Sequence, residues 1–321
     1  MKIETANSEN RTKPNVLETV KRFLLGNHLR GFVIRICMYI LLIDLAFVFL
    51  YPFIYMVTTA FKSPEDLVDI TVNYIPKGFY IKNFIAAYRS LNYNTGFINS
   101  TIVTTFSVIG HLISCSFIAY GFARYKFPGR DVLFAMVILT LIVPVQVLIF
   151  PLYIQYAKLG LINTYYPLIV PTYLGFGLRG GLFIFIFRQF YLGLPFELED
   201  AAKVDGCNAF RTYWTIVRPI AGASTLVSGV LAMVWHWNDY FEPNIYINQS
   251  ARYLLPANLP NMYAMMRRAP TDEMKTDEGE LLTNGAVAMA GTFLVILPIL
   301  IVYLFLQRKF MQGIERTGLV G

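Results

Sequence analysis

The sequence contains little charge for its length. Only 15% of its 321 residues are charged and 56% are hydrophobic, and its mean hydropathy is +0.51. In soluble domains about a quarter of the residues are charged. A chain of this composition does not match the soluble class, so we expect lipid to surround much of the protein.

Residues that commonly carry catalysis are also scarce. Three cysteines are present without the spacing of a metal site or a disulfide framework. The three histidines are not spaced from Ser, Cys or Asp in a way that indicates a nucleophilic site. The phosphate-binding pattern Gly-x-x-x-x-Gly-Lys-Ser/Thr is absent. We therefore expect no catalytic residue, no metal and no cofactor bound by this chain.

Long apolar runs, by contrast, are abundant. A run of about 18 apolar residues predicts a membrane-spanning helix, because a helix satisfies its own backbone groups in hydrocarbon. The fourth run is interrupted by Gly175, Gly177, Gly180 and Gly181. The sequence therefore predicts an all-α integral membrane protein with six transmembrane helices, at about 32–57, 97–122, 132–153, 166–187, 219–236 and 285–306.

The distribution of Lys and Arg predicts the topology, because positive charges near membrane ends stay on the cytoplasmic side. With both termini cytoplasmic, sixteen Lys and Arg residues fall on the inner side and nine on the outer side. The net charge of +7 is spread in short clusters beside the spans, which favours topology over nucleic-acid binding as its cause. We expect a cytoplasmic segment 1–31, one membrane domain 32–321, an inner loop 188–218 and an outer loop 237–284.

The inner loop 188–218 is predicted to form a helix, a turn and a second helix. Pro195 suits a first helical turn, and acidic residues that follow it suit the positive end of the helix dipole. Adjacent alanines let another surface approach closely, and Gly206 permits the left-handed geometry that ends a helix. This loop is the candidate working surface.

The same loop resembles the "EAA" loop of the permease subunits of ATP-binding-cassette (ABC) importers, which reads Glu-Ala-Ala, three residues and Gly, then nine residues to an ending of the form hydrophobic-x-Pro. Asp200 replaces the Glu, which keeps the charge on a shorter side chain. Residues 59–67, 237–240 and 307–321 also resemble maltose-type carbohydrate permeases, in particular the smaller, six-span subunit. The resemblance covers roughly residues 30–321, and its loop positions are Asp200, Ala201, Ala202, Asp205, Gly206, Phe210, Ile216 and Pro219.

The resemblance implies a type I ABC importer permease fold in the bacterial cytoplasmic membrane. It implies that residues 195–207 form a coupling helix seated in a separate ATPase, that the last outer segment reaches a binding protein, and that the C-terminal tail contacts the ATPases. The implied coupling residues are Glu197, Glu199, Asp200, Ala201, Ala202, Asp205, Gly206 and Phe210. The implied partners are a second homologous permease, an ATPase dimer that holds ATP and Mg, and an extracytoplasmic sugar-binding protein. The expected cargo is a carbohydrate, taken to be an oligosaccharide. The acidic outer stretch 272–280 is not explained by the family pattern.

Three residues are candidates for the substrate pathway. Arg179 lies beside the glycine-rich interruption, where it either lines a cavity or forms a structural ion pair, with Asp44 as a possible partner. Trp237 and Asn238 suit stacking on and hydrogen bonding to a sugar, although tryptophans at membrane interfaces also anchor spans. His111 is expected to make an interhelical hydrogen bond rather than to relay protons.

Two other classes of function stay open. A secondary transporter or channel needs no ATPase, but neither needs the loop motif, and the spans hold no chain of acidic residues for a proton relay. An ABC importer for a non-sugar solute, such as a glycerol phosphate ester or an amino acid, fits the same motif. A membrane enzyme is disfavoured by the scarcity of catalytic residues.

Overall fold

The computed structural model describes residues 16–267 and 285–318. All regular secondary structure among these residues is helical. The predictions for residues 1–15, for the acidic stretch 272–280 and for the last residues of the C-terminal tail lie outside the described residues. The chain divides into two compact units, residues 1–56 and 57–321. Each is considered by itself.

The first unit consists of the greater part of one long helix, α1 (Val16–Ala60), which contains Pro52. Its segment Ile34–Ala60 is long and apolar enough to cross a membrane. Aromatic rings stack along one side at a spacing of four residues, with centroids 5.9 Å apart for Phe47 and Tyr51 and 6.5 Å for Tyr51 and Tyr55. The first predicted span is therefore one continuous apolar helix.

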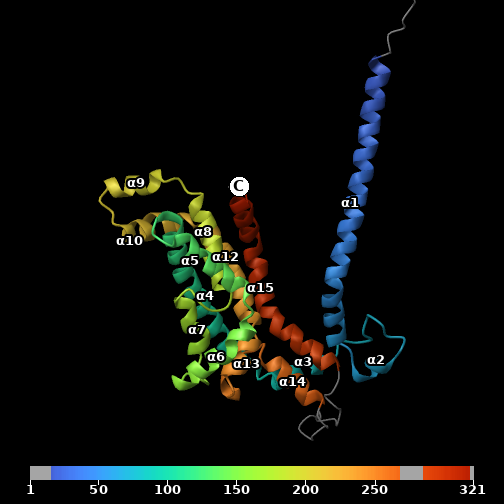
Figure 1. The fold of residues 1–321 in the computed structure, drawn as a ribbon. Coiled ribbons are helices and arrows are strands. Elements are labelled where there is room, and N and C mark those ends of the chain that lie inside the picture. Colours follow the sequence, from blue (N-terminus) through green and yellow to red (C-terminus); the bar gives the residue numbers. More distant parts are fainter. Residues whose placement is uncertain (1–15, 268–284, 319–321) are drawn as a thin grey trace, which may run out of the picture. The chain divides into compact units, whose positions relative to one another are not determined.

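The second unit is a bundle arranged around α4 (Tyr93–Arg124), which packs against α7, α8 and α12, while α15 packs against α12 and α3 (Figure 1). Short helices connect these elements at both ends of the bundle. Their bounds are α2 (Pro64–Val68), α3 (Lys82–Ser90), α5 (Arg130–Ile142), α6 (Val145–Lys158), α7 (Tyr166–Tyr173), α8 (Gly180–Leu192), α9 (Glu197–Val204), α10 (Ala209–Thr212), the π-turn η1 (Tyr213–Val217), α11 (Arg218–Ile220), α12 (Gly222–Asn238), α13 (Phe241–Tyr246), η2 (Ser250–Arg252), α14 (Asn258–Arg267) and α15 (Gly285–Gly318).

Small side chains let α4 approach its neighbours closely. A Cβ atom on Gly110 would lie 2.1 Å from the Thr172 hydroxyl of α7. The Ser116 hydroxyl lies 2.6 Å from the Tyr191 hydroxyl and 2.8 Å from that of Tyr213, so one α4 residue joins α8 and η1. Close approach of small residues and hydrogen bonds between helices hold helices together in lipid, where the hydrophobic effect between them is absent.

Three helices in the described part of the chain are long and apolar enough to cross a membrane, and six spans result if each of three bent helix pairs counts as one. The six predicted runs differ from the structure mainly at breaks. The run 132–153 bends by 99° between α5 and α6, where Pro144 interrupts the helix. The run 166–187 divides into α7 and α8, with a loop at the glycines that interrupt the sequence.

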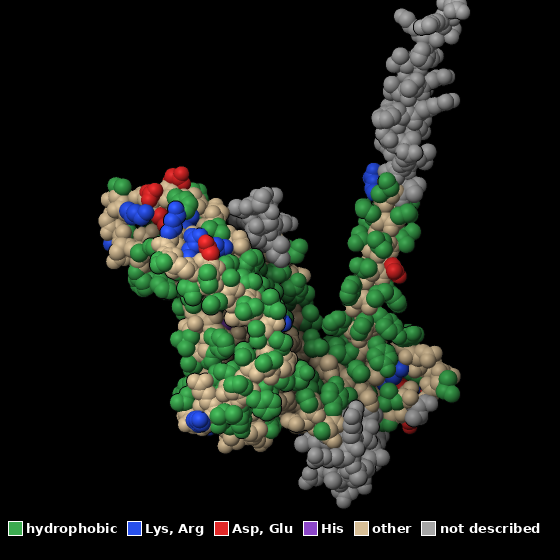
Figure 2. All heavy atoms as spheres, viewed as in Figure 1, with side chains coloured by type: hydrophobic (Ala, Val, Ile, Leu, Met, Phe, Trp, Pro, Cys, Tyr) green, Lys and Arg blue, Asp and Glu red, His purple; other side chains and the backbone are tan. Residues whose placement is uncertain are grey.

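The two ends of the second unit differ in character. The helices α9 and α10 lie at the same end as the C-terminal part of α15, and α3, α13 and α14 lie at the opposite end (Figure 1). Acidic and basic side chains gather over α9 and α10, whereas the visible middle of the bundle is largely hydrophobic or uncharged (Figure 2). This distribution suits an apolar belt with a charged surface at one end.

Candidate functional site

The predicted coupling loop forms the helix, turn and helix expected from the sequence. The helix α9 has three acidic residues in its first turn and ends at Val204, and Gly206 in the turn that follows has a left-handed φ of 79°. The Cys207 N–H donates to the Ala202 carbonyl at 2.9 Å, which closes the turn. The Asn208 side chain then accepts from the Arg211 N–H at 2.8 Å and starts α10. Pro195 lies just before α9 rather than within it.

The coupling residues divide between two faces of α9. Glu199 and Ala202 are buried, with 7% and 1% of their surface exposed. The outward face carries exposed acidic residues and the apolar side chains of Leu198 and Val204, of which Val204 is 88% exposed, and Phe210 of the neighbouring α10 is exposed as well. The sequence grouped the buried Glu199 and Ala202 with the exposed coupling residues and did not single out Leu198 or Val204. In the structure, the predicted coupling residues exposed on the surface are Glu197, Asp200, Ala201, Asp205, Gly206 and Phe210.

Glu199 faces inward because it pairs with Arg124, the last residue of α4. The Arg124 Nε lies 2.8 Å from the Glu199 Oε1, and only 1% and 9% of the two side chains are exposed. One Arg124 terminal nitrogen donates to the Leu194 carbonyl at 2.8 Å and to the Pro195 carbonyl at 3.3 Å. The guanidinium also stacks 4.3 Å from the ring centroid of Phe196. These contacts attach α9 and the segment before it to the end of α4.

Sequence reasoning missed Arg124 as a functional residue and counted it only as a topological charge. Its partner is 75 positions later in the chain, so no local spacing links them. One signal in the sequence could have indicated this role. Arg124 lies at the end of a long apolar helix, and such an end lies beside the polar loops on the same side of the membrane.

Asp200, which occupies the position of the family's Glu, is oriented differently from Glu199. Its carboxylate accepts from the Lys203 ammonium at 2.9 Å, and the two side chains are 67% and 68% exposed. An exposed pair of this kind contributes only about 0–1 kcal/mol. The Asp200 carboxylate therefore remains accessible to a partner on the outward face of α9.

Arg179 lies in the loop between α7 and α8. It has a left-handed backbone, with φ 63° and ψ 19°, and directly precedes the first residue of α8. Gly175 and Gly177 before it have φ values of 73° and 109°. A Cβ on Gly180 would lie 2.6 Å from the Gly175 carbonyl oxygen, and one on Gly181 would lie 2.6 Å from the Thr140 hydroxyl of α5. The glycines thus serve both unwinding and close packing, the two alternatives that the sequence left open.

Arg179 lines a cavity of about 460 Å³ formed by α5, α6, the loop between α7 and α8, and α13. The guanidinium lies 5.5 Å from the ring centroid of Trp235. Glu242 of α13 lines the same cavity, and burial together with the neighbouring Asp239 raises the pKa of Glu242 to about 8. Glu242 was not singled out by the sequence, because its outer loop position gave no sign of burial.

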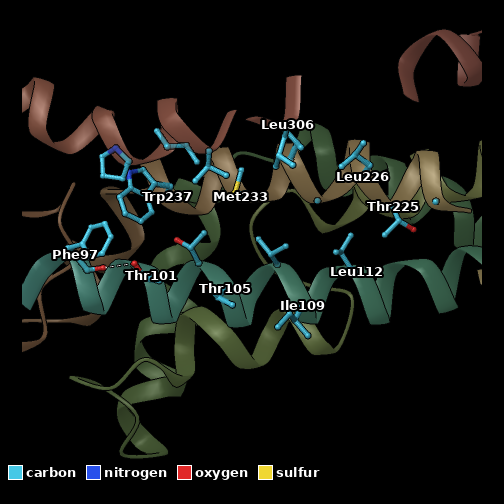
Figure 3. Close-up of a pocket in the computed structure, with 18 of the residues that line it drawn as sticks. Phe97, Thr101, Thr105, Ile109, Leu112, Thr225, Leu226, Met233, Trp237 and Leu306 are labelled. Atoms are coloured by element: carbon cyan, nitrogen blue, oxygen red, sulfur yellow. Dashed lines mark hydrogen bonds between the residues drawn. The ribbon is translucent and has the colours of Figure 1, made fainter. Parts of the chain in front are cut away.

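Trp237 and Asn238 lie elsewhere. The Trp237 indole is buried and donates to the Val295 carbonyl at 3.0 Å, which joins α12 to α15. It lines a second cavity, of about 780 Å³, between α4, α12 and α15. Figure 3 shows Trp237 beside Phe97 at one end of this cavity, with mostly apolar side chains and threonines along it. Asn238 is exposed, and its amide donates to the Val234 carbonyl at 2.9 Å.

His111 is fully buried beside the glycine-rich loop. Its Nδ1 lies 3.5 Å from the Cys115 sulfur on the same helix. Its ring packs between those of His236 and Phe183, with centroids 5.2 Å and 4.9 Å away. Among the described residues no group of His, Cys, Asp and Glu is arranged to hold a metal ion. His111 therefore joins α4, α8 and α12 by ring packing.

The chain is similar to known transport proteins. Residues 113–316 match the family described as "Binding-protein-dependent transport system inner membrane component". The arabinooligosaccharides transport system permease protein of Halalkalibacterium halodurans is 30% identical over 280 residues, which cover 86% of this chain and 93% of the relative. A probable starch degradation products transport system permease protein of Thermoanaerobacterium thermosulfurigenes is 29% identical over 85% of this chain and 92% of that protein.

A solved structure has the same fold. It is a crystal structure of a bacterial ABC transporter involved in the import of the acidic polysaccharide alginate, and one of its chains aligns with a TM-score of 0.71 at 22% identity, over 87% of this chain and 96% of the other. The match to the family covers most of the chain and includes α9 with its turn. The chain therefore belongs to the family of inner membrane components of binding-protein-dependent transport systems, the permease subunits of ABC importers.

Proposed function

We propose that this chain is a permease subunit of a carbohydrate importer, coupled to a separate ATPase through α9. The observation that carries the proposal is the two-faced structure of α9. Its inner face is tied to the end of α4 by the pair of Arg124 and Glu199, with the nitrogen and oxygen 2.8 Å apart. Its outer face exposes apolar and acidic side chains at the charged end of the bundle.

This arrangement suits transmission of motion. A helix held to the bundle by buried contacts moves with it as a rigid body, whereas a loosely held loop deforms. The outer face offers Leu198 and Val204 for apolar contact, and Asp200 for a charged contact with a basic group of the ATPase. Rigid-body movement of helices against a partner subunit is a general route to alternating access.

The proposed assembly contains a second, homologous permease, two ATPase subunits that hold ATP and Mg, and an extracytoplasmic sugar-binding protein. In it, this chain crosses the bacterial cytoplasmic membrane six times with both termini in the cytoplasm. Each bent helix pair then contributes one span, and in the pair of α8 and α9 the span is α8 while α9 lies outside the membrane. The end that carries α9 is the cytoplasmic end, and the C-terminal part of α15 lies at that end too (Figure 1).

We propose an oligosaccharide as the cargo. The named cargoes of two relatives are arabinooligosaccharides and starch degradation products, and these relatives match over 86% and 85% of this chain. Arg179 is proposed to line the pathway, and Trp237 and Asn238 are weaker candidates, because the indole is occupied by its hydrogen bond to Val295. The chain itself is proposed to be non-catalytic.

The test is affinity purification of the tagged chain from its own membranes in mild detergent. The proposal expects a second permease and an ATPase to copurify, and expects ATP hydrolysis to rise when binding protein and an oligosaccharide are added. Stimulation by a non-sugar solute instead would correct the cargo. A chain that purifies alone and catalyses uptake without ATP after reconstitution would favour a secondary transporter or channel and contradict the proposal.

A further inference from the structure

The cavity at the broken helix has the size of a small-molecule site, and its mostly apolar lining carries a few polar side chains. Its volume of about 460 Å³ falls within the range of roughly 300–1,000 Å³ that is usual for small-molecule sites. Polar groups from three elements line it, namely Gln146 of α6, Arg179 before α8 and Glu242 of α13, together with the hydroxyls of Tyr156 and Tyr246. These amide, hydroxyl and carboxyl groups match the hydroxyls of a sugar chain.

Arg179 has a backbone conformation that is unfavourable for a residue with a side chain. A non-glycine residue in the left-handed region costs about 1–2 kcal/mol, and Arg179 has φ 63°. Residues held in such conformations cluster at functional sites, where the surrounding structure fixes them. Here the surrounding structure is the tight packing of Gly180 and Gly181 against Gly175 and α5.

Among the described residues of the second unit, no acidic side chain forms an ion pair with Arg179. The ion pairs among these residues join Lys77 to Asp69, Arg124 to Glu199, Arg130 to Asp131, and Lys203 to Asp200. The Arg179 side chain is exposed, although it directly precedes α8, which forms a bent candidate span together with α9. Ionisable residues at such positions face water-filled cavities and pair with an opposite charge.

The second ionisable side chain of the cavity does not supply that charge at neutral pH. The pKa of Glu242 is raised to about 8 by burial and by Asp239, so its carboxyl group is mostly protonated at pH 7. A protonated carboxyl group donates a hydrogen bond to an anion instead of repelling it. Arg179 and Glu242 together therefore favour an anionic ligand in this cavity.

On these observations, and resting on the proposed function, we propose that Arg179 recognises a carboxylate of the cargo, and that the cargo is an acidic oligosaccharide containing uronic acid residues. The planar guanidinium forms two parallel hydrogen bonds with a carboxylate. The neighbouring polar groups of the cavity then bind the sugar hydroxyls.

The test uses the complete importer in proteoliposomes and a matched pair of probes, trigalacturonate and its methyl ester, which differ in charge. The quantity measured is the ratio of the ATP-dependent uptake rates of acid and ester, for the wild type and each variant with the same binding protein, so that the preference of the binding protein cancels. We expect Arg179→Gln to lower this ratio by at least about tenfold, as for loss of a hydrogen bond to a charged group, and Arg179→Lys to lower it less. The matched control is Lys158→Gln, which removes an exposed charge outside the cavity and should leave the ratio unchanged.

Three results would overturn the proposal. If Arg179→Gln slows uptake of the acid and the ester equally, the counter-charge of Arg179 belongs to protein, either Asp44 or a partner subunit. If the wild type imports neutral oligosaccharides but excludes trigalacturonate, the proposed function stands and the acidic cargo is wrong. If the wild type shows no ATP-dependent uptake of any oligosaccharide, the proposed function fails and this inference fails with it.

Discussion

Two arginines of the second unit occupy opposite situations. Arg124 at the end of α4 is almost completely buried, is paired with a carboxylate, and contacts two carbonyls and an aromatic ring. Arg179 before α8 is exposed in a cavity and has no ion pair with the residues of the second unit that the structure describes. A buried charge that is paired with an opposite charge ties together the elements that carry the two groups. An exposed charge among apolar helices is costly unless it meets a ligand or a partner.

We propose different tasks for the two regions. The region of Arg124 joins α9 to α4 and is proposed to transmit motion, and the region of Arg179 is proposed to receive cargo. The helix α4 belongs to both, since it ends at Arg124 and packs against α7 and α8 on either side of the break. A change at the coupling end should therefore affect transport of every cargo, whereas a change in the cavity should affect selection among cargoes.

The largest effect is expected at Arg124. Arg124→Ala leaves the Glu199 carboxylate buried without its partner, which costs about 3–5 kcal/mol and should uncouple ATP hydrolysis from uptake. The matched control is Arg130→Ala, because Arg130 pairs with Asp131, which is 79% exposed, and such pairs contribute about 0–1 kcal/mol. Denaturant unfolding and the ratio of sugar imported to ATP hydrolysed measure both effects. If Arg124→Ala and Arg130→Ala lowered the free energy of unfolding and the coupling ratio equally, the distinction between buried and exposed ion pairs would be wrong.

The next effect is expected on the outward face of α9. Val204 is 88% exposed, so Val204→Asp should leave the stability of the chain within about 0.5 kcal/mol of the wild type. It places a charge where we propose an apolar contact with the ATPase, and it should weaken association with the ATPase by at least about tenfold, as for burial of an unpaired polar group. Binding of the purified ATPase to the permease in nanodiscs measures this. Unchanged binding would move the docking surface away from Val204.

A smaller effect is expected at the turn after α9. Gly206 has φ 79° and no atom lies within 4 Å of a Cβ placed on it, so Gly206→Ala is opposed by backbone strain alone, of about 1–2 kcal/mol. Gly206→Asn is the matched variant, because Asn adopts the left-handed region more readily. The temperature of thermal unfolding and the ratio of sugar imported to ATP hydrolysed should both be highest with glycine, lower with asparagine and lowest with alanine at position 206. A bulky residue that leaves uptake unchanged would count against coupling through this turn.

The smallest effect concerns pH. The pKa of Glu242 is about 8, so its carboxyl group is neutral when the pH is lower and charged when the pH is higher. Because the charged carboxylate repels an acidic cargo, uptake of trigalacturonate should decline as the pH rises through 8. The titratable or charged groups near Glu242 are Asp239, Tyr156, Tyr246 and Arg179. Glu242→Gln should remove the decline for the acid and leave the pH profile of its methyl ester unaltered. A decline that persists in this variant would assign it to another group.

The sequence predicted the features that depend on local pattern. Apolar runs located the helices, and the residues from Pro195 to Gly206 predicted the short helix and its left-handed end, which the structure confirms. The break at Pro144 was missed, because apolar residues continue on both sides and the run reads as one span. Periodicity and length do not report such a bend when the composition stays constant.

The features that depend on long-range pairing could not be predicted. Arg124 and Glu199 are far apart in the chain, so only the packing of α4 against the inner loop brings them to 2.8 Å. The inward direction of Glu199 and the outward direction of Asp200 follow from that pairing. The sequence made Trp237 a candidate for sugar stacking, and the structure shows that its indole N–H donates a hydrogen bond to the Val295 carbonyl. The site residues therefore needed the tertiary structure to be sorted by role.

The central claim is that the outward face of α9 binds a separate ATPase, and crosslinking in native membranes tests it most directly. A photoreactive amino acid would replace Val204 in the full chain, and a control would carry it at Leu159, which is 63% exposed at the end of α6. The account predicts that the probe at Val204 crosslinks to an ATP-hydrolysing subunit and that the probe at Leu159 does not. Absence of an ATPase crosslink at Val204, with the chain correctly inserted and abundant, would contradict the account.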